Sequence, residues 1–267
     1  MSEYRISEIH IYPVKSLPGI SLQNSLVEER GLKYDRRWML VDSENMFITQ
    51  RLLPQMVFIN VTIENENLIF THKRKLLNPL SLPIKQIPTK QMLVQVWDDN
   101  CSANEYENEV NEWFSDALEF KCKLVYMPDN TKRKTSTKYF SKSKNVSFAD
   151  GYPYLIIGQA ALDHLNDKLK FPVNMLQFRP NIVFTGGKEH DEDNWKEIKI
   201  GKLNFNIVKP CARCVITTIG LENGNKNKEP LATLSKYRNF QNKIMFGQNV
   251  ICHSEGMIKI DDEIKVA

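Results

Sequence analysis

Short runs of alternating apolar and polar residues dominate the first half of the chain. Each run is bounded by turn residues and is rich in β-branched or aromatic side chains, which is typical of half-buried strands. Four segments show this pattern: 4–14, 36–42, 57–70 and 92–97. The Glu-Asn-Glu-Asn stretch at 64–67 interrupts the third and predicts a hairpin turn. The first half is therefore expected to be mostly β-structure.

Two segments have the spacing of a helix instead. Residues 103–118 are expected to form the first helix, capped by Ser102. Its apolar residues fall close to one face: Tyr106, Val110, Trp113, Phe114 and Leu118. The second helix is expected over 159–169, after a strand-like apolar run.

The rest of the second half again predicts short strands. A buried strand is expected after Pro180, which fixes φ and biases Arg179 towards an extended conformation. Further strands are expected at 203–209, 214–220, 248–253 and 256–267. Many short strands with few helices predict a β-rich α+β protein, and favour barrels over a doubly wound sheet.

A basic segment separates the two halves. Six Lys or Arg residues and no acidic residue lie between 130 and 148, without regular apolar periodicity. We expect an exposed loop here and an internal boundary near it, with one domain over 1–125 and a second over 126–267. A strand exchange across that boundary remains open.

Composition excludes several classes of protein. Hydrophobic residues make up 42% and charged residues 25% of the 267 residues, as in ordinary globular proteins. The net charge of +4 is too weak to indicate nucleic acid by itself. No apolar run approaches the roughly 20 residues of a membrane span, and no secretion signal is visible. Five cysteines, an odd and sparse count, favour free thiols in a reducing compartment, so we expect a cytoplasmic protein.

The pair Cys211 and Cys214, two residues apart, allows several chemistries. A structural zinc site requires four ligands, and no second motif completes the set. A redox pair is expected at a helix N-terminus, whereas a strand-like segment follows Cys214. Both thiols would also fit as small buried side chains. Cys214 is the better candidate for a site, because Lys209 and Arg213 would stabilise a thiolate. A soft thiolate suits a metal whose other ligands come from a cofactor.

Cationic residues near predicted strand ends form a second candidate group. Arginine binds phosphate bidentately and lysine adds a point charge, so together they would suit an anion. Each alone is more typical of a solvated strand end. The group comprises Lys15 with Ser16, Arg36 with Asp35 and Arg37, and Arg179 with Asn181.

Taken together, these segments resemble the MOSC superfamily. More closely, the chain resembles proteins that pair a MOSC N-terminal β-barrel domain with a MOSC domain, namely the YcbX-like bacterial proteins and the mitochondrial amidoxime-reducing components. The resemblance implies the first domain at 1–125 and the MOSC domain at 126–267. The matching stretches run in the family's order: IYPVKSLPG, RGLKYDRRWMLVD with FITQR, DGYPYLIIGQAALDHLN, FRPNIVFTG, CARCVITTI and FGQN.

The resemblance implies a bound molybdenum cofactor, whose dithiolene supplies two sulfurs and whose phosphate is anionic. It implies that Cys214 is the protein ligand of the metal and that Asp150 lies near it as a second catalytic residue. The residues implied to hold the cofactor are Lys15, Ser16, Arg36, Arg179, Asn181 and Arg213. Cys211 falls at a family cysteine and is not expected to be a ligand.

The resemblance further implies a reductase of N-hydroxylated or N-oxygenated small molecules, such as hydroxylaminopurines, hydroxamates or amidoximes. No plant-type ferredoxin motif and no membrane anchor is visible, so we expect electrons from a separate flavodoxin-, ferredoxin- or cytochrome-like protein. The basic segment 131–144 would steer such a partner, or is simply a solvated loop. The alternative function is a cofactor carrier or sulfur-transfer protein. A nucleic-acid module ranks last, because few aromatic residues accompany the lysines.

Overall fold

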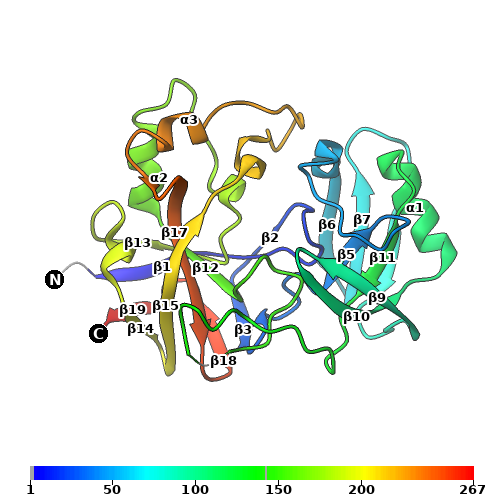
Figure 1. Cartoon of the computed structure of the whole chain (residues 1–267), viewed down its shortest axis with the longest axis horizontal. Coiled ribbons are helices and arrows are strands. Elements are labelled where there is room, and N and C mark those ends of the chain that lie inside the picture. The colour runs from blue at the N-terminus through cyan, green and yellow to red at the C-terminus, as the bar shows by residue number, and fades with distance from the viewer. Residues whose placement is uncertain (1–2, 142) are drawn as a thin grey trace.

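The structure is a computed structural model, which describes residues 3–141 and 143–267. Two lobes are visible in Figure 1, a larger one that holds both chain termini and a smaller one that carries α1. Strands predominate in both lobes, and the β-rich α+β class with few helices is confirmed.

Seven strands of the larger lobe close into a barrel, because β12 pairs with β13 on one side and with β17 on the other. β2 (Ile20–Leu22) and β16 (Asn239–Phe240) extend this sheet by pairing with β1 and β17. In ring order the barrel strands are β12 (Tyr154–Gly158), β13 (Ile182–Thr185), β1 (Tyr4–Ile11), β19 (Glu263–Val266), β14 (Glu197–Ile200), β15 (Leu203–Ala212) and β17 (Lys243–Cys252).

Three smaller sheets complete the β-structure. The first contains β5 (Trp38–Val41), β11 (Lys123–Tyr126), β10 (Asp99–Glu105) and β9 (Lys90–Val96). The second contains β6 (Ile59–Glu64), β7 (Asn67–His72) and β8 (Leu80–Pro83). The third contains β18 (Gly256–Lys259), β3 (Asn24–Glu28) and β4 (Gly31–Leu32).

The hairpin turn expected at 64–67 is confirmed. Asn65 and Glu66 join β6 to β7, and their φ angles are 48° and 61°. A two-residue hairpin turn favours positive φ because its twist then matches that of the strands. Asparagine tolerates this conformation better than most residues, which explains why it stands here.

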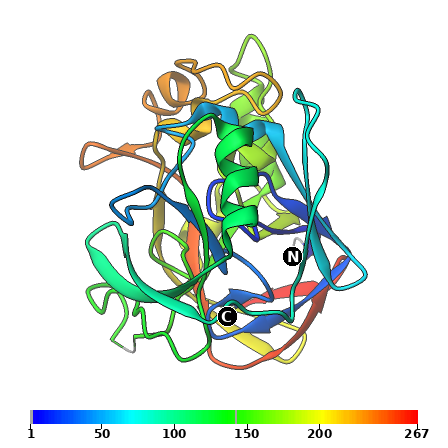
Figure 2. The ribbon, with the colours of Figure 1, turned by 90° about the vertical axis from the view of Figure 1, so that its right-hand side faces the viewer.

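The helices are short. They are α1 (Asn108–Leu118), α2 (Gln159–Asn166) and α3 (Leu231–Leu234), and the 3-10 helices are η1 (Pro54–Phe58), η2 (Met175–Phe178), η3 (Asp191–Asn194) and η4 (Val215–Thr218). α1, which faces the viewer in Figure 2, buries Val110, Phe114 and Leu118 on one face in the core of the smaller lobe. Among the described residues, no helix has the length and apolar character needed to cross a membrane.

The start of the first helix was predicted wrongly. Residues 99–105 form β10, which pairs along its whole length with β9, so Ser102 lies in a strand and caps no helix. The helix begins at Asn108, after Glu107. The apolar spacing from Val110 onwards does correspond to a helix, but residues 99–105 pair with β9 and form a strand.

The two predicted domains share strands. β1, from the first tenth of the chain, closes the barrel between β13 and β19. β3 likewise pairs with β18 from the C-terminal end. The division at residue 125 stays a prediction, since the strand that begins the chain is an integral part of the C-terminal barrel.

Candidate functional site

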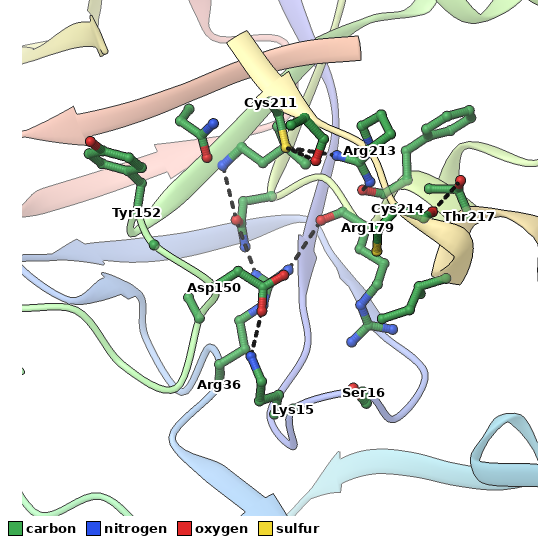
Figure 3. A pocket seen from close by; sticks show the side chains of 18 of the residues that line it. Lys15, Ser16, Arg36, Asp150, Tyr152, Arg179, Cys211, Arg213, Cys214 and Thr217 are labelled. Atoms are coloured by element: carbon green, nitrogen blue, oxygen red, sulfur yellow. Dashed lines mark hydrogen bonds and ion pairs between the residues drawn. The ribbon is translucent and has the colours of Figure 1, made fainter. Parts of the chain in front are cut away.

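One pocket gathers eight candidate residues from the sequence, whereas Asp35 and Arg37 do not line it. Its lining comes from the smaller lobe at Thr49 and Arg51, and from the barrel at Cys211 and Asn249. Figure 3 shows basic and sulfur-bearing side chains facing one another across it. The eight expected residues in the lining are Lys15, Ser16, Arg36, Asp150, Arg179, Asn181, Arg213 and Cys214.

Backbone hydrogen bonds join the segments that carry Lys15 and Arg36. The amide of Lys15 donates to Trp38 O at 2.8 Å, and the amide of Arg36 donates to Tyr12 O at 2.9 Å. The amide of Phe148 then donates to Arg36 O at 2.9 Å. This ladder brings three segments distant in sequence to one side of the pocket.

Arg36 is held by an ion pair and by an aromatic ring. It donates to the buried carboxylate of Asp35, whose other oxygen accepts from the Tyr12 amide at 2.7 Å. Its guanidinium lies 4.5 Å from the centre of the Tyr12 ring. Burial lowers the pKa of Arg36, but Asp35 outweighs this and the net pKa is raised. Arg36 is therefore a permanent, oriented cation.

Asn181 orients the Arg36 side chain through a hydrogen bond. It is 1% exposed, and its Oδ1 accepts from Arg36 Nη1 and from the Leu155 amide, each at 3.2 Å. Its Nδ2 donates to His10 O at 3.1 Å. With these groups engaged, Asn181 contributes to an anion site chiefly by orienting the arginine.

Arg179 presents an unsatisfied guanidinium. Its Nη2 is buried and has no hydrogen-bond partner among the described residues. The guanidinium lies 4.2 Å from the centre of the Tyr12 ring, which it shares with Arg36. Burial, followed by repulsion from Arg36, lowers the pKa of Arg179 to about 10. It remains charged at neutral pH, so the geometry favours an anionic ligand.

The extended conformation expected for Arg179 was wrong. Its φ and ψ are 55° and 47°, in the left-handed region, because it terminates η2 with its amide donating to Leu176 O. Its own carbonyl accepts from Arg36 Nη2 at 3.2 Å. The helix end and this contact override the bias from the following proline, and the turn directs the side chain over Tyr12.

Lys15 and Asp150 form an ion pair at the pocket. Lys15 Nζ donates to Asp150 Oδ1 at 2.6 Å and to Phe148 O at 2.8 Å. Enclosure of Asp150 by the pocket walls raises its pKa, but the charge and hydrogen bond of Lys15 outweigh this and the net pKa lies below its usual range. Burial lowers the pKa of Lys15 despite this pairing. The Asp150 side chain is 70% exposed, so its carboxylate is open to the cavity.

The two cysteines differ in their surroundings. Cys214 is exposed, whereas Cys211 is half-buried and its Sγ accepts from Arg213 Nη1 at 3.0 Å. The expectation that Lys209 and Arg213 flank the Cys214 thiolate was wrong. Arg213 turns to Cys211 and to Phe178 O, and Lys209 lies over the rings of two tyrosines.

The strand expected at 214–220 does not form. Val215–Thr218 form η4, and Cys214 precedes it in an extended conformation. Thr217 N and Oγ1 both donate to Cys214 O, at 3.1 and 2.9 Å. β-branched residues suggested a strand, but β15 ends at Ala212 and, within 214–220, Ile219 alone forms a β-bridge, with Lys226. The tight turn leaves the thiol at the cavity surface.

Two further residues shape the pocket and were not singled out. Arg51 lines it, and its guanidinium lies 4.4 Å from the centre of the Trp97 ring. Arg133 is 4% exposed and donates to the carbonyls of Ser147 and Ala149, at 2.8 and 2.6 Å. The FITQR motif, which ends at Arg51, was the available signal for that residue.

The basic loop is only partly exposed, in contrast to the expectation. Buried and exposed residues alternate along it, because the inward side chains support the segment leading to Asp150. The inward ones are Thr131, Arg133 and Thr135, and the outward ones are Lys132 and Lys134. Lys142, one of the six counted basic residues, lies outside the described residues.

Two protein families match the chain. The MOSC N-terminal beta barrel domain matches residues 3–121, and the MOSC domain matches residues 143–265.

Curated relatives extend over most of the chain. The mouse (Mus musculus) mitochondrial amidoxime-reducing component 1 is 30% identical over 97% of this chain and 81% of its own length. The human (Homo sapiens) mitochondrial amidoxime reducing component 2 is 32% identical over 87% of this chain and 72% of its own length. The molybdenum cofactor sulfurase of rice (Oryza sativa subsp. japonica) is 30% identical over 98% of this chain, which spans only 34% of the sulfurase. The chain therefore belongs to the MOSC superfamily, among the proteins that join a MOSC N-terminal β-barrel domain to a MOSC domain.

Proposed function

We propose that this protein is a molybdenum-cofactor-dependent reductase of N-hydroxylated small molecules, such as hydroxylaminopurines, hydroxamates and amidoximes. The observation that carries the proposal is an exposed thiol, Cys214, in the same pocket as Arg179, whose buried Nη2 has no hydrogen-bond partner among the described residues. The relatives named as amidoxime-reducing components support the reaction class.

The donor set of the pocket fits the cofactor. A soft thiolate suits molybdenum, and we propose Cys214 as the protein ligand that adds to the two dithiolene sulfurs. The anionic end of the cofactor requires cations and N–H donors. Arg179 Nη2 and Arg213 Nε are both buried without a partner among the described residues, so they would supply them. Lys15, Ser16 and Arg36 would complete this cradle, with Asn181 orienting Arg36.

The reaction consumes two electrons and two protons. The N–O bond of the N-hydroxyl group breaks, an N–H bond forms and one water molecule leaves. When bound, the cofactor supplies the two electrons. The protein would position the cofactor and control access to the pocket.

Asp150 is the residue best placed to orient the groups that donate protons in the reaction. Its pKa lies below the usual range, so at neutral pH it is a carboxylate that accepts hydrogen bonds. We propose that it orients a water molecule or the polar N–H and O–H groups of the substrate. Lys15, which pairs with it, keeps the carboxylate ionised.

Electrons come, in this proposal, from a separate flavodoxin-, ferredoxin- or cytochrome-like protein in the cytoplasm. The outward lysines 132 and 134, with Lys138, would attract an acidic partner over long range. Turnover with such a donor should fall as the salt concentration rises, because salt screens exposed charges. A rate insensitive to salt would count against this steering. The free state of all five cysteines supports a reducing compartment.

A cofactor carrier or sulfur-transfer protein is the second candidate function. It is favoured by the match to molybdenum cofactor sulfurase and by the exposed thiol of Cys214, which would carry a persulfide or hold cofactor for delivery.

One experiment separates the two functions. Protein purified from a cofactor-competent host is analysed for molybdenum and then supplied with an artificial electron donor and a hydroxylamine-type substrate. A reductase contains molybdenum and turns the substrate over. A carrier contains molybdenum but shows negligible turnover, and protein without molybdenum from such a host would contradict both.

A further inference from the structure

Trp97 does not line the pocket, but it is hydrogen-bonded to Asp150, which does. It stands at the tip of the hairpin formed by β9 and β10, and its indole Nε1 donates to Asp150 Oδ1 at 3.2 Å. Lys15 Nζ donates to the same oxygen at 2.6 Å. Two donors on Oδ1 fix the rotation of the carboxylate and leave Oδ2 for the cavity.

The Trp97 ring also contacts the cations around this carboxylate. The Arg51 guanidinium lies 4.4 Å from the ring centre, and Lys15 Nζ lies 5.9 Å from it. Phe47 packs against the same indole with 5.0 Å between ring centres. Cations gain electrostatic stabilisation over an aromatic face, which favours a single arrangement of these side chains.

The backbone of Trp97 is unusual for a bulky residue. Trp97 is the first of the two residues between the paired Val96 and Asp99, and its φ is +57°. Glycine, asparagine and aspartate dominate hairpin positions with positive φ, whereas a bulky side chain is strained there. Such strain occurs preferentially at functional sites, where the surrounding contacts maintain it.

We propose that Trp97 is a positioning residue. It holds Asp150 in the orientation in which its carboxylate accepts hydrogen bonds from water or substrate in the pocket. It acts through Asp150 and does not itself line the cavity. This role rests on the proposed reductase function for its effect on turnover, but the orientation of Asp150 is a property of the protein without cofactor.

The orientation is tested first in apoprotein. Uniformly ¹⁵N-labelled protein gives indole N–H resonances from four tryptophans, which single Trp→Phe variants assign. Asp150→Asn should shift the Trp97 indole resonance and leave that of Trp113 in place, because Trp113 Nε1 donates to Asn78 O instead. A Trp97 resonance that does not move in this variant overturns the proposal.

The effect on catalysis is tested with Trp97→Phe, which keeps an aromatic face and loses the N–H. Turnover should fall about 10-fold, as when hydrogen-bond partners behind functional groups are removed elsewhere. The melting temperature and the bound molybdenum should stay unchanged, and Trp113→Phe, the matched control, should keep full turnover. Full turnover in Trp97→Phe overturns the positioning role. If wild-type protein lacks turnover, the proposed function fails, while the resonance shift still decides the orientation of Asp150.

Discussion

The two walls of the pocket differ in how completely the protein satisfies its own charges. On one wall, Arg36 is paired with Asp35 and Lys15 with Asp150, and backbone hydrogen bonds join their segments. On a second wall, Arg179 Nη2 and Arg213 Nε have no partner among the described residues, and Cys214 is exposed.

The difference indicates where a ligand contributes binding energy. A buried donor without a partner costs about 1–3 kcal/mol, and an anion that accepts from it removes this cost. A cation already paired with a carboxylate gains less. The second wall, with Arg179, Arg213 and Cys214, is therefore expected to depend on the ligand. The first wall, with Lys15 and Arg36, is expected to be assembled without it.

The largest expected effect is on the assembled wall, from Asp35→Asn. This change leaves the Arg36 charge without its carboxylate in a buried setting, so unfolding free energy should fall by about 3 kcal/mol or more. Urea denaturation of the apoprotein measures it. Lys85→Gln, which removes one side of the exposed Lys85–Glu66 pair, is the control and should leave the unfolding free energy almost unchanged. Equal effects of the two variants would mean that the assembled wall does not stabilise the fold.

Cys214→Ser should give the next largest effect. It should weaken cofactor binding and leave the stability of the fold unchanged. Because the exposed thiol is the soft ligand, bound molybdenum and turnover should fall by more than about 100-fold, while the melting temperature stays unchanged. Cys211→Ser is the control, since a hydroxyl still accepts from Arg213, and turnover should stay within a few-fold of wild type. If both variants lose molybdenum alike, the single-ligand assignment fails.

A smaller effect is expected from Arg179→Met, which keeps the volume beside Tyr12 and removes the guanidinium. Cofactor retention should weaken about 10- to 100-fold, the range for a lost charge-assisted hydrogen bond. The apoprotein should be as stable as wild type or more stable, because burial and Arg36 already lower the pKa of Arg179. Arg5→Met, remote from the pocket, makes the same change in net charge and should retain cofactor fully. Loss of stability without loss of cofactor would place Arg179 among structural residues.

Local patterns in the sequence determined a large part of this protein. Apolar patterns predicted β1, β5, β6, β7 and β9 but not β2, β3, β4, β8 or β10. The Glu-Asn-Glu-Asn turn was confirmed, and the apolar face of α1 lies in the core as spaced. The motifs, together with the family resemblance that they carry, also singled out the eight residues that share the pocket.

Only the tertiary structure decided which strands pair and where side chains point. β1 closes the C-terminal barrel, Arg213 turns to Cys211, Arg179 adopts a left-handed turn, and Trp97 reaches Asp150 across 53 positions of the chain. These outcomes depend on long-range hydrogen bonds and packing, which outweigh local preferences of about 1 kcal/mol per residue. The residue types of the site are local information, whereas its geometry depends on contacts between segments distant in sequence.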